Sequence, residues 1–242
     1  MTSRIVMGIG VCMIIASTSR PGSSRAEGVG AHRVTKENLD LPASAGAAIE
    51  EVCPLGSVEV ADRRFEGDAF IFVVDSSRLV RGIADLEVVQ FHLIRAIERL
   101  SDGVNLAIIA FDTKVIRYPA RGLPVVATES TRDEARRWVR ELEAADPICP
   151  RAALEEALDL ARRLGGRSTM IFYVALDGVL CPGEEEAEYY AETLAAVHQR
   201  NAAGVPIHAI GVGAPNSREW NRFLVRLATE SGGEYVPICY AR

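Results

Sequence analysis

The sequence predicts an α/β fold in which a doubly wound, mostly parallel sheet of six strands carries helices on both faces. Continuous apolar runs such as "AFIFVVD" at 69–75 are typical of strands that are covered on both sides. Segments whose apolar residues have helical spacing alternate with these runs. Such alternation produces a parallel sheet, because each helix crosses back over the sheet before the next strand begins.

The strands are predicted in order along the chain. They lie at 69–75, 104–111, 114–118, 169–176, 206–212 and 233–237. Only the strand at 114–118, near one edge, should run antiparallel, since too few residues separate it from the strand before it for a crossover. The helical patterns lie at 85–100, 130–145, 150–166, 184–204 and 217–233. A short edge strand is expected at 58–65, before the main sheet.

The first 26 residues have the pattern of an export signal. Arg4 is followed by a 13-residue apolar core at 5–17, which is shorter than the ~20 residues of a membrane-spanning helix. "SRA" at 24–26 places small residues at both positions that determine cleavage. We expect cleavage after Ala26, with no transmembrane span afterwards, and an exported protein that is periplasmic, cell-surface or extracellular. The alternative is an uncleaved N-terminal segment that anchors the chain.

Residues 27–66 are weakly patterned, and we interpret them as a linker or N-terminal extension before a folded domain at 67–242. The formal net charge is -6, so no general basic field exists for binding nucleic acid. Signal cleavage would leave four cysteines, Cys53, Cys149, Cys181 and Cys239. An even number in an exported chain favours two disulfides, with three possible connectivities. The alternative is four buried free thiols.

Two carboxylates follow buried strands directly. Asp75 ends the first strand, and Asp177 follows the strand at 169–176. Ligands of parallel sheets bind at the carboxyl ends of the strands. Carboxylates and hydroxyls there are also the ligands that hard cations prefer. The sequence therefore predicts the functional site at this edge of the sheet.

The chain from about 68 to 238 resembles a von Willebrand factor type A (vWA) domain. The resemblance is carried by "FIFVVDSS", "CPRAALEEALDLA", "TMIFYVALDGV" and "IHAIGVG". In that family, a D-x-S-x-S loop, a threonine and a further aspartate hold a divalent cation. Matched position by position, the resemblance implies that Asp75, Ser77 and Asp177 remain as metal ligands.

Two ligand positions of the family lack oxygen in this sequence. Leu79 stands where the second serine belongs, and Ala152 stands where the threonine belongs. Because Mg²⁺ requires near-octahedral oxygen coordination, we expect a degenerate site of low occupancy and no obligatory cofactor. Two nearby carboxylates need charge compensation, so we expect Arg151, before Arg78, to replace the cation as a charge surrogate.

The same fold would bring the cysteines together in pairs. Cys149 and Cys181 fall in two loops that crown the sheet, so a Cys149–Cys181 disulfide would join loops that a cation otherwise bridges. Cys53 precedes the first strand and Cys239 follows the last one. Because domain termini often lie close together, we also predict a Cys53–Cys239 disulfide.

The favoured interpretation is an exported, non-enzymatic interaction domain that binds a protein partner through the C-terminal face of the sheet. One alternative is an adhesion module that still binds Mg²⁺ through Asp75, Ser77 and Asp177. A second alternative is a hydrolase-like enzyme that uses the pair Asp75 and Asp177. The sequence offers no nucleophile–base pair for such an enzyme.

Overall fold

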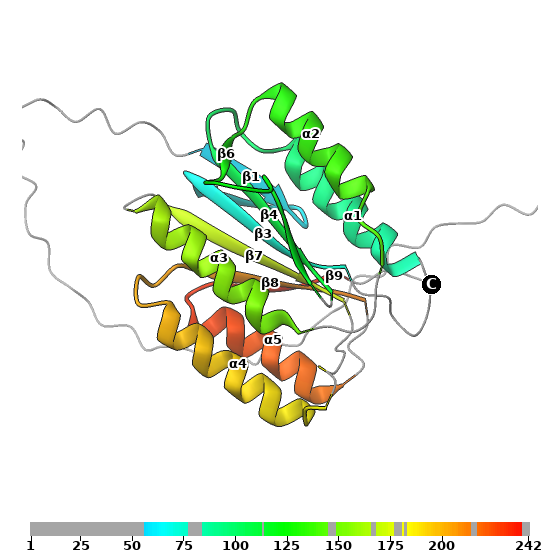
Figure 1. The fold of residues 1–242 in the computed structure, drawn as a ribbon, viewed down its shortest axis with the longest axis vertical. Coiled ribbons are helices and arrows are strands. Elements are labelled where there is room, and N and C mark those ends of the chain that lie inside the picture. Colours follow the sequence, from blue (N-terminus) through cyan, green and yellow to red (C-terminus); the bar gives the residue numbers. More distant parts are fainter. Residues whose placement is uncertain are drawn as a thin grey trace, which may run out of the picture. The chain divides into compact units, whose positions relative to one another are not determined.

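A seven-stranded sheet forms the centre of the folded unit (Figure 1). Its strands are β3 (Ala69–Asp75), β4 (Asn105–Phe111), β5 (Val115–Tyr118), β6 (Val125–Val126), β7 (Thr169–Ala175), β8 (Ile207–Val212) and β9 (Tyr235–Ile238). The structure is a computed structural model. It describes residues 56–76, 84–112, 114–144, 149–165, 168–176, 181, 183–213 and 217–238, all within the unit Val52–Arg242.

The strand order is β5-β4-β3-β7-β8-β9, and β6 also pairs with β4. The pairs among β4, β3, β7, β8 and β9 are parallel, as predicted, and β8 lies inside the sheet. The prediction of six strands was wrong by one. β6 runs antiparallel to β4 through two residue pairs, so two strands are antiparallel instead of one. A strand of two residues has too short a pattern to be recognised in the sequence.

In the described part of the chain, five helices cover the two faces of the sheet, which confirms the doubly wound prediction (Figure 1). α1 (Ala84–Glu98) and α2 (Glu129–Arg140) lie on one face. α3 (Pro150–Leu164), α4 (Glu186–Arg200) and α5 (Arg218–Glu230) lie on the other. Alternate residues of the central strands β3, β4, β7 and β8 enter the two cores; in β3, for example, Phe72 enters the first and Val73 the second. In the described part, no helix is long and apolar enough to span a membrane.

A hairpin precedes the main sheet. β1 (Gly56–Val60) and β2 (Arg63–Gly67) form an antiparallel two-stranded sheet of their own, which corrects the prediction of a single edge strand at 58–65. The Phe65 ring lies 5.0 Å from the ring of Phe172 and 4.5 Å from that of His208. Residues 56–66 of the expected linker therefore pack on the core. The rest of the expected linker lies outside the described residues.

His208 of β8 packs against Phe65 of the hairpin and Phe172 of β7, and we call this group of three rings the aromatic slot. The His208 side chain is 6% exposed, and its ring stacks on Phe172 at 5.1 Å. Its Nδ1 accepts a hydrogen bond from the Glu234 N–H at 3.2 Å, so Nδ1 carries no proton in this arrangement. Burial lowers the pKa of His208, and the Glu234 carboxylate opposes this effect. Glu234 is itself paired with Arg63 of β2 at 2.5 Å.

Acidification is therefore expected to weaken the fold through His208. Because the pKa of His208 is lower in the folded state, the unfolded chain binds the proton more readily. The contribution of His208 to the free energy of unfolding is therefore fully present above the unfolded pKa of about 6.5, and it declines as the pH falls below that value. Urea unfolding between about pH 5 and 8 measures this slope. The slope should be smaller in His208→Asn, whose amide oxygen can accept the Glu234 N–H without titrating.

His92 also contributes to the dependence of stability on pH. Burial and the nearby Arg95 also lower the pKa of His92, so a smaller slope of the same sign should remain in His208→Asn. An unchanged slope in that variant would mean that His208 does not couple to folding.

Candidate functional site

The carboxyl ends of β3 and β7 lie side by side where the winding of the chain reverses. The chain leaves β3 through α1 to reach β4 on one side, and leaves β7 through α4 to reach β8 on the other. Doubly wound sheets bind ligands in the crevice at such a reversal point. We call this part of the molecule the apex and define it by Asp75, Ser76, Leu176 and the Cys149–Cys181 pair.

Asp75 is 0% exposed at the end of β3. Its Oδ2 accepts a hydrogen bond from the Leu176 N–H at 3.3 Å, which joins the ends of β3 and β7. The next residue, Ser76, donates both its N–H and its hydroxyl to the carbonyl oxygen of Phe111, each at 3.1 Å. The apex thus connects three neighbouring strands by hydrogen bonds, and the Asp75 carboxylate has a structural role within it.

Two aromatic side chains lie beneath the apex in the core, and neither was predicted from the sequence as part of the site. Trp220 donates its indole N–H to the Leu176 carbonyl at 2.9 Å. Tyr173 is fully buried and stacks on Phe111 at 5.9 Å. Burial raises the pKa of Tyr173 well above its ordinary value, and the charge of Asp75 raises it further. The signal available for Tyr173 was a polar aromatic residue inside an apolar run; its buried hydroxyl has no hydrogen-bond partner among the described residues.

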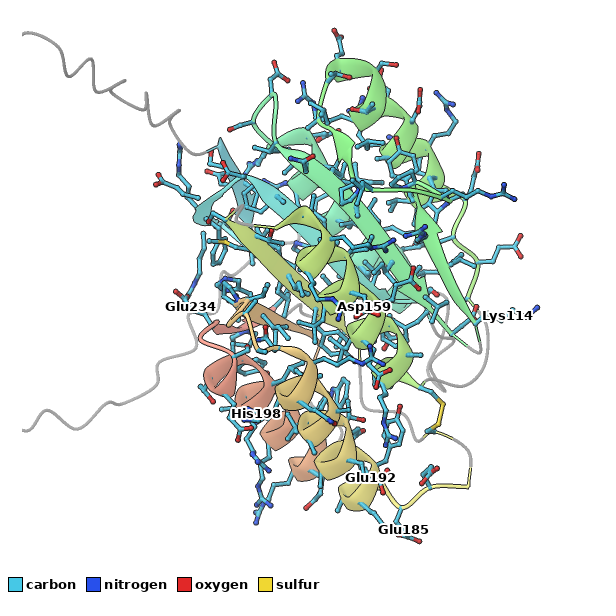
Figure 2. All side chains as sticks on the ribbon, turned by 60° about the vertical axis from the view of Figure 1, so that its left-hand side comes forward. Lys114, Asp159, Glu185, Glu192, His198 and Glu234 are labelled. Carbon is cyan, nitrogen blue, oxygen red and sulfur yellow. A yellow bond between two sulfur atoms is a disulfide. The ribbon has the colours of Figure 1, made fainter. Side chains whose placement is uncertain are left out.

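The predicted Cys149–Cys181 disulfide is present, which confirms that pairing (Figure 2). The Cα atoms are 5.0 Å apart, within the range for disulfides. Cys149 is the N-cap residue of α3, and Pro150 occupies the first helical position, where proline loses no helical hydrogen bond. Cys181 precedes α4 in the chain. The bridge therefore holds the start of α3 against the segment that leads from β7 into α4.

Arg151 belongs to the first turn of α3 and contacts α4. Its Nη2 pairs with Glu192 Oε2 at 2.7 Å, and its guanidinium lies 5.0 Å from the ring centroid of Tyr189. Its N–H also donates to the Tyr189 hydroxyl at 3.3 Å. Among the described residues the carboxylate paired with Arg151 is thus Glu192 and not Asp75. The sequence could not predict this pairing, because it depends on how α4 is rotated against α3.

Comparison with models of protein families shows which family the chain belongs to. A family model described as the von Willebrand factor type A domain matches residues 68–236, which is more than half of the chain. The chain belongs to the von Willebrand factor type A family. The resemblance noted in the sequence is therefore confirmed at the level of the family. Comparison with curated proteins gives no match.

Solved vWA structures share the fold at low sequence identity. A von Willebrand factor type A protein from Catenulispora acidiphila is 18% identical with a TM-score of 0.59; the match covers 72% of this chain and 40% of that one. The vWF domain of the type V pili tip protein Mfa5 from Porphyromonas gingivalis is 11% identical with a TM-score of 0.55, covering 76% and 90%. The pilus adhesin SpaC from Lactobacillus rhamnosus GG is 14% identical with a TM-score of 0.52, covering 70% and 28%.

Of the family's cation-ligand positions, the described part of this vWA domain includes those of Asp75 and Ala152. Ala152, at the threonine position, has an exposed methyl group that lines a hollow on the outer side of α3. Glu155, Glu156 and Asp159 line the same hollow; Figure 2 labels Asp159. Within the described residues, no group of three or more His, Cys, Asp or Glu side chains is arranged to hold a metal ion. Of the carboxylates predicted as ligands, the described part contains Asp75, whose Oδ2 already accepts the Leu176 N–H.

Several predicted site residues lie outside the described residues. They are Ser77, Arg78, Leu79 and Asp177 of the apex loops, and the Cys53 and Cys239 pair. Their roles stay predictions.

Proposed function

We propose that this vWA domain is an exported, non-enzymatic module that binds a protein partner at the C-terminal face of its sheet without a bridging cation. The observation that carries the proposal is the Cys149–Cys181 disulfide of the apex. In vWA domains that use a cation, the resemblance implies that the metal joins the apex loops. Here a covalent bond joins two of the segments around the apex instead.

The hydrogen bonding at the apex supports a site that is complete without metal. Asp75 Oδ2 accepts a hydrogen bond from the Leu176 N–H, which joins the ends of β3 and β7 without a cation. Leucine at 79 and alanine at 152 supply no oxygen. The guanidinium of Arg151 neutralises Glu192 beside the apex. A partner that docks there meets polar and apolar groups, with charge already balanced around Arg151.

The disulfide also supports export. Disulfides persist in oxidising compartments and are rare in the cytosol, which agrees with the apolar segment and small residues of the first 26 positions. Two of the structural neighbours are described as a pilus adhesin and a pilus tip protein, and an adhesive role in this chain would suit such a fold.

Among the described residues, the groups around Asp75 are not arranged as a nucleophile and its base. A serine nucleophile needs a base that accepts its proton. The Ser76 hydroxyl, next to Asp75, instead donates to the Phe111 carbonyl and is 1% exposed. We therefore assign the apex to binding.

Calorimetric titration with Mg²⁺ tests the proposal directly. Chelator-treated protein is expected to give no saturable heat below about 1 mM Mg²⁺, because too few oxygens remain for octahedral coordination. Micromolar binding that disappears in Asp177→Ala would overturn the proposal. The double variant Leu79→Ser, Ala152→Thr is the positive control. A gain in its Mg²⁺ affinity would show that the two hydroxyls were the missing ligands, and no gain would indicate a rebuilt apex.

A further inference from the structure

One edge of the sheet differs in character from the rest of the molecule. Residues 114–126, which we call the basic edge, contain β5, β6 and the loop between them. Their sequence is "KVIRYPARGLPVV", with three basic residues and no acidic one, in a chain whose net charge is -6. The chain therefore concentrates positive charge at a place where the sheet ends.

Among the described residues, no strand pairs with one side of the β5 backbone. β5 pairs with β4 and, within the described residues, with no other strand. The Asp112 N–H donates to the Lys114 carbonyl, and hydrogen-bonded pairs alternate along an antiparallel ladder. The next bonded pairs are accordingly Ala110 with Ile116 and Ile108 with Tyr118. The N–H and C=O groups of Val115 and Arg117 therefore point outward, where another strand can pair with them.

The opposite edge of the sheet is less suited to such pairing. β9 contains the exposed Pro237, which removes one backbone donor. The basic edge also contains three exposed large apolar residues. Ile116 is 47% exposed, Leu123 51% and Val126 51%; among the described residues, Phe91 is the one other large apolar side chain with comparable exposure. Of these, Ile116 belongs to β5 itself and is available to a strand that pairs with this edge.

The charges indicate what kind of strand would bind. Arg117 pairs with Glu156 at 3.5 Å, whereas the exposed Lys114 and Arg121 have no ion pair with another described residue. Figure 2 shows Lys114 extending away from the end of β5. A second copy of the chain paired edge to edge would bring two sets of these cations to one interface, and neither 114–126 segment contains an acidic side chain to neutralise them. An extended segment with acidic side chains would neutralise them.

We propose that the basic edge binds an extended acidic segment of a partner protein, which adds a strand to the sheet beside β5. Main-chain hydrogen bonds to Val115 and Arg117 provide affinity, as in other complexes formed by strand addition. Lys114 and Arg121 select acidic side chains, and Ile116 contacts apolar ones between them. The proposal rests on the proposed interaction function but does not involve the apex, so the Mg²⁺ titration and the experiment below can fail independently.

Fluorescence polarisation with a labelled peptide of about seven residues, alternating glutamate and valine, tests the proposal on the full chain. A second peptide, with lysine in place of glutamate, is measured for comparison. The wild type should bind the acidic peptide at least about tenfold more tightly than the basic one, with binding that weakens between about 50 and 300 mM salt. Lys114→Glu with Arg121→Glu should lower the affinity about tenfold or more. Val115→Pro, which removes one outward N–H, should weaken binding at both salt concentrations.

The matched control is Arg218→Glu with Arg222→Glu, which makes the same charge change at exposed positions of α5 and should bind within about twofold of the wild type. Equal binding of the two peptides, or an unchanged affinity after charge reversal at the basic edge, would overturn the proposal. Lys114 would then be a charged residue that prevents other strands from pairing with this edge. A concentration-dependent dimer that Val115→Pro abolishes would overturn it in favour of a second copy. The charge-reversal comparison decides by itself if Val115→Pro does not fold.

Discussion

Removing the Cys149–Cys181 disulfide is expected to lower the free energy of unfolding by about 3–4 kcal/mol. The bridge joins residues 32 apart in the sequence, and a cross-link of this length restricts the unfolded chain considerably. In the folded state it fixes the N-cap residue of α3, where no side-chain hydrogen bond caps the helix. Denaturant unfolding of the oxidised wild type and of Cys149→Ala with Cys181→Ala measures the difference.

The double variant is preferable to chemical reduction, because it leaves Cys53 and Cys239 untouched. A single Cys149→Ala variant separates loss of the bridge from loss of packing, since both thiols pack against the α3–α5 side of the core. It should lose nearly as much stability as the double variant. A loss below about 1 kcal/mol would mean that the unfolded chain is already restrained in this region.

Phe65→Ala is expected to destabilise the domain by about 3–4 kcal/mol, although Phe65 precedes the first residue of the family match at 68. Phe65 is 8% exposed and contacts Phe172 and His208. Truncation would open a cavity between β2 and the sheet. Thermal and denaturant unfolding of this variant therefore test whether the hairpin is part of the cooperative unit.

Phe65→Leu is the matched control, because leucine keeps most of the buried volume and should cost less than about 1.5 kcal/mol. The hairpin would be an independent attachment if Phe65→Ala left the midpoint of the main transition unchanged. In that case the acid sensitivity expected from His208 would be lost as well, since both residues belong to one aromatic slot.

The central strands could be predicted because burial on both faces produces long apolar runs. "AFIFVVD" and "TMIFYVA" are fully or almost fully buried in β3 and β7, and their ends locate the apex. The Cys149–Cys181 pair could be predicted for a related reason. Once the family resemblance ordered the strands, the two loops could lie only above the same edge.

The hairpin at 56–67 could not be recognised in full, because its turn has an unusual sequence. Ala61 and Asp62 both have positive φ, 49° and 59°, in a two-residue connection that normally uses Asn-Gly or a similar pair. Without a glycine to mark the turn, the segment read as a single strand. The pairing of Arg151 with Glu192 could not be predicted for another reason. The contact between Arg151 and Glu192 joins two helices whose relative rotation is decided by packing.

The disulfide also has a mechanical consequence. It closes a covalent loop that contains all of α3 and β7. β7 is the strand that pairs with β3, at whose end Asp75 lies. When the two ends of the chain are pulled apart, the roughly 32 residues inside this loop cannot be drawn out, so the oxidised chain extends about 110 Å less than the reduced one. A central strand of the sheet is thereby shielded from tension, and a load would be carried around the apex through the sulfur–sulfur bond.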